Sequence, residues 1–107
     1  MENKKDWIAL FMVVKGGFAD EIMEIAIEAG LPAATILNAR SERADHQHIL
    51  GISVDKEKEF IVSITDEETA KRVMAVVIEE SDAKQLGNTF CFTMPVENVV
   101  GLVADKE

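Results

Sequence analysis

Apolar residues recur along this chain with two different periods, and each period predicts one kind of element. Residues 7–14 form an unbroken apolar run, in which Leu10 and Met12 would face one side of an extended strand and Ala9 and Phe11 the other. A strand that is apolar on both sides needs both faces of its sheet covered. The run therefore predicts a strand at the centre of a sheet.

Two segments have the spacing of an amphipathic helix. In the first, apolar residues recur every three or four positions across residues 18–29, opposite a row of carboxylates, and Gly30 and Pro32 follow as stop signals. In the second, residues 65–68 read Thr-Asp-Glu-Glu, which predicts a capping box with Thr65 as the N-cap. An apolar stripe follows this cap at helical spacing, so a second helix is expected there.

Three further strands are predicted at residues 33–40, 60–64 and 89–94. A polar segment at about residues 41–50 predicts a loop, and residues 49–54 are expected to extend a strand or to form an edge segment. Residues 96–102 are expected to make a final turn or short strand, and residues 103–107 a solvated tail.

The predicted order is strand, helix, strand, strand, helix, strand. Right-handed crossovers place these elements in a ferredoxin-like α+β sandwich, a four-stranded antiparallel sheet with two helices on one face. Residues 1–107 would form one such domain. Two helices cover only one face of the sheet, yet the first strand is apolar on both, so we expect a homo-oligomer in which sheet faces pack together.

Composition narrows the choice of partners. The chain has 11 Lys and Arg against 20 Asp and Glu, a formal net charge of −9. Such a surface repels polyanions, so a general nucleic-acid binder or a protein drawn to an anionic membrane is not expected. No signal peptide or membrane-spanning run is evident, and the single cysteine, Cys91, cannot form an intrachain disulfide, which predicts a cytoplasmic protein without membrane insertion.

Three stretches, at residues 17–23, 34–40 and 92–102, resemble the PII signal-transduction family, the nitrogen regulatory proteins, and in particular its compact PII-like members. The resemblance spans about residues 8–102. It implies a homotrimer with the sheets facing inward and an adenine nucleotide, ATP, ADP or AMP, in the clefts between subunits. It further implies a regulatory role, in which the trimer senses a small-molecule effector and the loop after the second strand engages a target protein.

The resemblance also implies a set of ligand-binding residues. These are Thr35, Asn38 and Arg40 on the second strand, and Lys84, Gly87 and Asn88 at the turn before the last strand. Two of the family's phosphate-binding cations are missing, because Phe90 stands about where a lysine is expected and Gly101 where a basic residue is expected. The chain has no tyrosine, so uridylylation of a loop tyrosine cannot operate.

The alternative prediction is a metal-responsive trimer, similar in fold to the divalent-cation-tolerance proteins. His46 and His48 are separated by one residue in the polar loop, so both imidazoles would point the same way in an extended segment and could bind Zn²⁺ or another late transition metal. No serine or cysteine lies beside a histidine in a nucleophile motif, and no phosphate-binding glycine motif of a known enzyme class occurs. We therefore expect a binding protein and not an enzyme.

Overall fold

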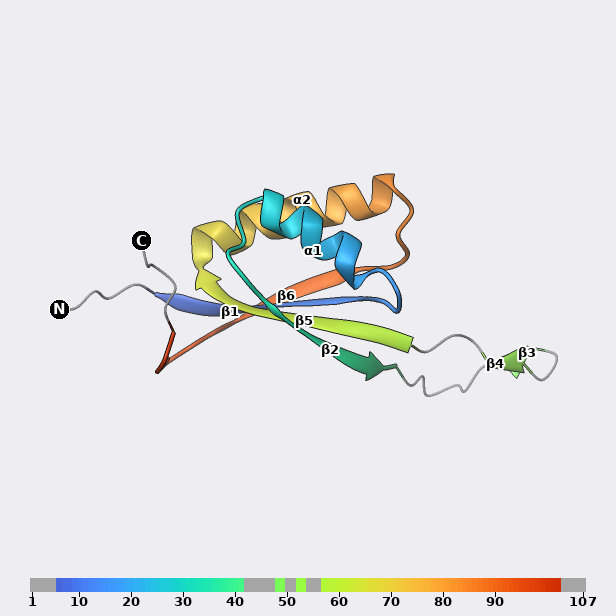
Figure 1. The fold of residues 1–107 in the computed structure, drawn as a ribbon, viewed down its shortest axis with the longest axis horizontal. Coiled ribbons are helices and arrows are strands. Elements are labelled where there is room, and N and C mark those ends of the chain that lie inside the picture. The colour runs from blue at the N-terminus through green and yellow to red at the C-terminus, as the bar shows by residue number, and fades with distance from the viewer. Residues whose placement is uncertain (1–5, 42–47, 50–51, 54–56, 103–107) are drawn as a thin grey trace.

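The computed structural model describes residues 6–41, 48–49, 52–53 and 57–102. The elements are β1 (Trp7–Lys15), α1 (Ala19–Glu28), β2 (Thr35–Arg40), β3 (His48–Ile49), β4 (Ile52–Ser53), β5 (Glu57–Asp66), α2 (Glu67–Ala83) and β6 (Phe90–Pro95). Four strands form the main sheet in the order β2-β5-β1-β6, and both helices lie on the same side of it (Figure 1). The predicted ferredoxin-like sandwich is confirmed.

All neighbours in the main sheet are antiparallel, and β1 and β5 are the two central strands. The β1–β5 ladder runs from Trp7 opposite Asp66 to Lys15 opposite Lys58. Side chains directly opposite each other in such a ladder share a face of the sheet. This register assigns every residue of the sheet to the face that the helices cover or to the face that they leave open.

The core lies between the helices and the covered face. Leu10, Met12 and Val14 alternate along β1, have no exposed surface, and form one cluster with Ile22 of α1 and Val73 of α2. The first helix ends as its stop signal predicts. Its last carbonyls accept hydrogen bonds from the two residues after the C-cap, with Gly30 in the left-handed region at φ +117°.

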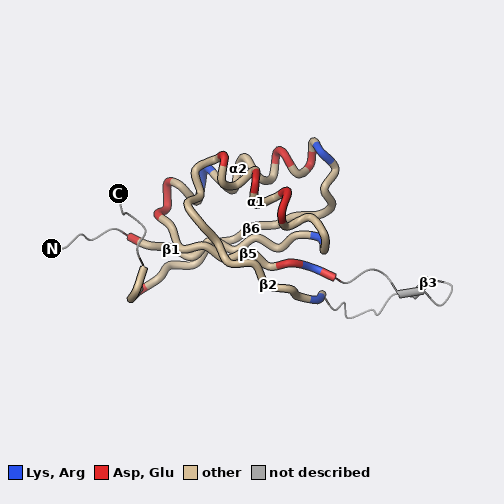
Figure 2. The backbone as a smooth tube through the Cα atoms, viewed as in Figure 1, with Lys and Arg blue, Asp and Glu red and all other residues tan. Residues whose placement is uncertain are grey.

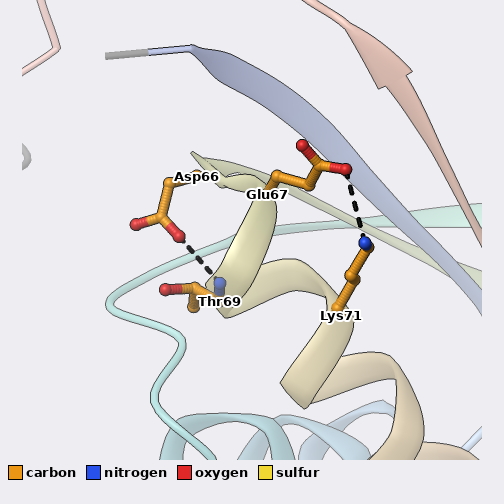
Figure 3. A network of polar contacts seen from close by, with 4 residues as sticks. All are labelled: Asp66, Glu67, Thr69 and Lys71. Atoms are coloured by element: carbon orange, nitrogen blue, oxygen red, sulfur yellow. Dashed lines mark hydrogen bonds and ion pairs between the residues drawn. The ribbon is translucent and has the colours of Figure 1, made fainter.

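The start of α2 differs from the prediction by one residue. The N-cap is Asp66, whose carboxylate accepts a hydrogen bond from the Thr69 backbone N–H at 2.7 Å (Figure 3). Thr65, the predicted cap, is buried in β5 opposite Ile8. The strand is longer than its apolar run, so pairing with β1 keeps Thr65 in the sheet and leaves the capping position to Asp66. Figure 3 also shows an exposed ion pair between Glu67 and Lys71, 3.6 Å apart.

Replacing Asp66 with alanine is expected to lower the free energy of unfolding by about 1 kcal/mol, because the first turn of α2 loses its side-chain acceptor. Urea unfolding measures this change. Glu67→Ala, which removes only an exposed ion pair, is the control and should cost less. A larger loss for Thr65→Val than for Asp66→Ala would contradict the observed cap.

The segment between β2 and β5 contains a two-stranded hairpin of its own. β3 pairs with β4, with His48 opposite Ser53 and Ile49 opposite Ile52, and neither strand joins the main sheet. The hairpin lies beyond the ends of β2 and β5 (Figure 1). The predicted loop is thus interrupted at residues 48–49, and the described residues of the 49–54 segment, Ile49, Ile52 and Ser53, belong to this hairpin and not to the main sheet.

Candidate functional site

One face of the main sheet is apolar, and neither α1 nor α2 covers it (Figure 1). From the register, the side chains on this open face are Ala9, Phe11, Val13, Thr35, Leu37, Phe60, Val62, Ile64, Phe90, Phe92 and Met94. Four of them leave 39–57% of their surface exposed: Leu37, Phe90, Phe92 and Met94. Contiguous apolar surface of this kind is unusual on a monomer and typical of a protein interface.

Aromatic rings dominate the open face. Phe11 on the central strand stacks on Phe92 with ring centroids 4.8 Å apart, and it contacts Phe60 at 5.5 Å in a tilted arrangement. Phe90 extends the row, 6.2 Å from Phe92. The rings come from three adjacent strands and form a continuous apolar strip across the sheet.

The predicted ligand-binding residues lie on opposite edges of the sheet. Thr35, Asn38 and Arg40 belong to the edge strand β2, whereas Lys84, Gly87 and Asn88 precede the other edge strand, β6. The strands β5 and β1 separate the two groups, which is a distance of three strand spacings of about 4.8 Å each. The fold therefore does not bring the six residues together within one chain.

The two faces of the sheet divide the residues of β2 as well. Thr35 is opposite Val62 and lies on the open face, while Asn38 and Arg40 are opposite Glu59 and Glu57 on the covered face. All three are exposed. Arg40 lies at the end of the sheet where β5 begins, and Figure 2 shows basic and acidic residues gathered there.

The turn between α2 and β6 holds the second group. Lys84 is the C-cap of α2, and its ammonium lies 3.5 Å from the Glu80 carboxylate on the helix surface. Gln85 and Gly87 both have positive φ, +57° and +89°, so the chain reverses sharply at this point. Leu86 between them is buried and anchors the turn to the core.

A shallow pocket of about 120 Å³ lies beside this turn. Glu21, Glu24 and Ile25 of α1 line it together with Lys84 and Leu86. Sites for small organic ligands usually measure about 300–1,000 Å³. The pocket is therefore too small for a nucleotide, and its two carboxylates repel phosphate.

Glu59 is a structural residue that sequence reasoning missed. Its carboxylate accepts hydrogen bonds from the backbone N–H groups of Gly17 and Ala19, at 2.9 and 3.1 Å. These donors lie at the N-terminus of α1, where helix geometry favours an anion. Glu59 therefore already occupies that anion position. The contact joins residues 40 and 42 positions apart, so no local pattern indicates it.

Lys15 is a second residue that sequence reasoning missed. The stem of its side chain crosses Gly87, so closely that a Cβ built on the glycine would lie 3.1 Å from the Lys15 Cβ and 3.0 Å from its Cδ. The Lys15 ammonium lies 5.9 Å from the centre of the Phe18 ring. The charged end of β1 is thus placed beside the turn before β6.

The thiol of Cys91 offers no nucleophile at neutral pH. Burial raises its pKa to about 11, and a protonated, partly buried thiol reacts slowly.

The predicted metal site falls mostly outside the described residues. His46 is not among them, and His48 is described only as part of β3. Within the described part of the chain, no three His, Cys, Asp or Glu side chains are grouped so that they could hold a metal ion. The metal site on His46 and His48 stays a prediction.

No described helix has both the length and the apolar content that a membrane span requires.

No protein-family model matches the chain, and no curated protein matches its sequence. Solved structures do match. A protein of Thermus thermophilus described as PII-like and signalling is 18% identical over 86% of this chain and 88% of its own, with a TM-score of 0.65. CPII of Thiomonas intermedia bound to ADP and bicarbonate is 18% identical over 84% and 87%, with a TM-score of 0.56.

A second CPII structure, bound to ADP, AMP and acetate, is 16% identical over 88% of this chain and 91% of its own, with a TM-score of 0.60. At these identities the comparisons concern the fold. The chain has the ferredoxin-like fold of the PII-like signalling proteins over most of its length.

Proposed function

We propose that this chain is a compact PII-like regulatory protein. In this proposal it assembles as a homotrimer, binds an adenine nucleotide in the clefts between subunits, and signals to a partner protein through the segment between β2 and β5. The observation that carries the proposal is the fold shared with CPII, a protein whose structures contain ADP and AMP. The short sequence stretches that resemble the PII family point the same way.

The open face supports assembly from several copies. Its aromatic strip would be covered if the sheets of neighbouring copies packed face to face, and each copy would bury the same patch. Among the described elements no helix is available to cover it.

The separation of the predicted ligand residues supports a site between copies. Arg40 and Asn38 lie on one edge of the sheet and Gly87 and Asn88 beside the other. If the β2 edge of one copy lies next to the β6 edge of another, both groups face a single cleft. A nucleotide that bridged the two groups would then bind to the assembled protein and not to the single chain.

The charge of the protein favours a small ligand over a polymeric one. With a formal net charge of −9, a phosphate has to be held by a few nearby cations and by backbone N–H groups. Phe90 and Gly101 stand where the PII resemblance leads us to expect two cations. We therefore expect ADP or AMP to bind at least as tightly as ATP.

Calorimetric titration with ATP, ADP, AMP and adenosine tests the proposal, once the mass in solution is known. We expect a trimer that binds ADP, and about tenfold weaker binding in Arg40→Ala and in Lys84→Ala, each of which loses one charged contact. Lys71→Ala, on the exposed face of α2, is the matched control and should bind as the wild type does. A trimer that binds none of the four ligands would refute the proposed function. Unchanged affinity in both variants would refute the assigned cleft.

A further inference from the structure

The turn before β6 raises the question of which cation holds a phosphate there. Lys84 alone holds a phosphate weakly, because it pairs with Glu80 and lines a pocket that also contains Glu21 and Glu24. The N-terminus of α1 is no better, because the Glu59 carboxylate already accepts hydrogen bonds from the backbone N–H groups of Gly17 and Ala19 there. A second cation at this turn has to come from another element.

Lys15 comes from β1 and reaches the turn. Its aliphatic stem passes directly over Gly87, so closely that a Cβ at residue 87 would lie 3.0 Å from the Lys15 Cδ and the stem would have to shift. Gly87 also has φ +89° and is exposed, a backbone conformation that leaves space for an anion to approach its N–H group. The absence of a side chain at residue 87 thus allows the lysine and the turn to lie against each other.

The Lys15 ammonium forms no ion pair with a carboxylate in the described part of the chain. In the β1–β5 ladder the residue directly opposite Lys15 is another cation, Lys58. Like charges directly opposite each other on adjacent strands destabilise a sheet. A bound anion beside Lys15 would reduce this repulsion.

We propose that Lys15 binds a phosphate of the nucleotide at the turn that Gly87 forms. This inference rests on the proposed function and adds a phosphate-binding residue that the sequence did not indicate. The ammonium, which lies 5.9 Å from the centre of the Phe18 ring, donates to the phosphate oxygens, while the stem stays packed on Gly87. The ligand class is a nucleoside diphosphate or monophosphate.

The experiment compares ADP with adenosine in Lys15→Met, Lys15→Arg and the wild type. Methionine keeps an unbranched stem over Gly87 and removes the charge, whereas arginine keeps the charge. We expect Lys15→Met to weaken ADP binding about tenfold and adenosine binding less than about twofold. Lys15→Arg should retain most of the ADP affinity. Lys71→Met, which removes a lysine from the exposed face of α2, is the matched control.

Salt adds a second readout, because screening weakens a charged contact and leaves stacking of the base unaffected. The ADP dissociation constant should rise less steeply with salt in Lys15→Met than in the wild type. An unchanged ADP affinity in Lys15→Met would overturn the proposed role of Lys15 and would leave the proposed function standing. Equal losses for ADP and adenosine would also overturn it, since they would show a structural effect. A wild type that binds neither ligand would overturn the proposed function and this inference with it.

Discussion

Glutamate in place of Phe92 is expected to convert the proposed trimer into monomers. Phe92 lies on the open face, stacks on Phe11 at 4.8 Å, and leaves 39% of its surface exposed in the single chain. A carboxylate at this position would be buried without a partner when two apolar sheets meet, which costs several kcal/mol. The mass in solution, measured by light scattering after size-exclusion chromatography, should fall to that of one chain.

Ile78→Glu is the matched control for this prediction. Ile78 is also a large exposed apolar residue, 43% exposed, but it lies on α2 and not on the open face. It should leave the mass unchanged. Leu37→Glu provides a second variant on the open face, at the edge strand β2, and far-UV circular dichroism shows whether each variant is folded. Folded variants at both positions that keep the wild-type mass would refute assembly through the open face.

Alanine in place of Leu10 is expected to cost about 2–5 kcal/mol of the free energy of unfolding. Leu10 lies at the middle of the central strand, has no exposed surface, and packs in the cluster that joins both helices to the sheet. Removing its side chain leaves a cavity that rigid neighbours on both sides cannot fill. A domain of this size has about 5–15 kcal/mol in total, so the loss should be visible as a large shift of the urea midpoint.

Ile27→Ala is the control, because it removes an aliphatic side chain from the surface and not from the core. Ile27 is 52% exposed on α1, and its truncation should change the free energy of unfolding by less than about 0.5–1 kcal/mol. Similar midpoint shifts for the two variants would mean that Leu10 does not lie in the core that the structure describes.

Most of the fold could be predicted because its signals are local. The unbroken apolar run of β1 and the helical stripes of α1 and α2 each identify an element within a window of about 10–20 residues. The capping residue of α2 was missed because it depends on where β5 stops. That end is decided by pairing with β1, a strand more than fifty positions away, so Asp66 and not Thr65 caps the helix.

The contacts around the candidate site could not be predicted in the same way. Resemblance indicated Arg40 and Gly87, but neither Glu59 nor Lys15 belongs to a recognisable motif. Lys15 and Gly87 are seventy-two positions apart, and they meet only because β1 and β6 are neighbours in the sheet. The strand order also separates Arg40 from Gly87, so the two residues can share a site only if different copies of the chain supply them.

By itself the sequence determined the order of the elements, the ferredoxin-like class, and the presence of an apolar sheet face that two helices cannot cover. These features follow from the spacing of apolar residues, which can be read from residues that are close together in the sequence. Only the tertiary structure decided that Glu59 occupies the N-terminus of α1, that Lys15 crosses Gly87, and that the predicted ligand residues lie on opposite edges. Such contacts depend on strand order and register, which are set by packing of the whole chain and are not encoded in any short segment of it.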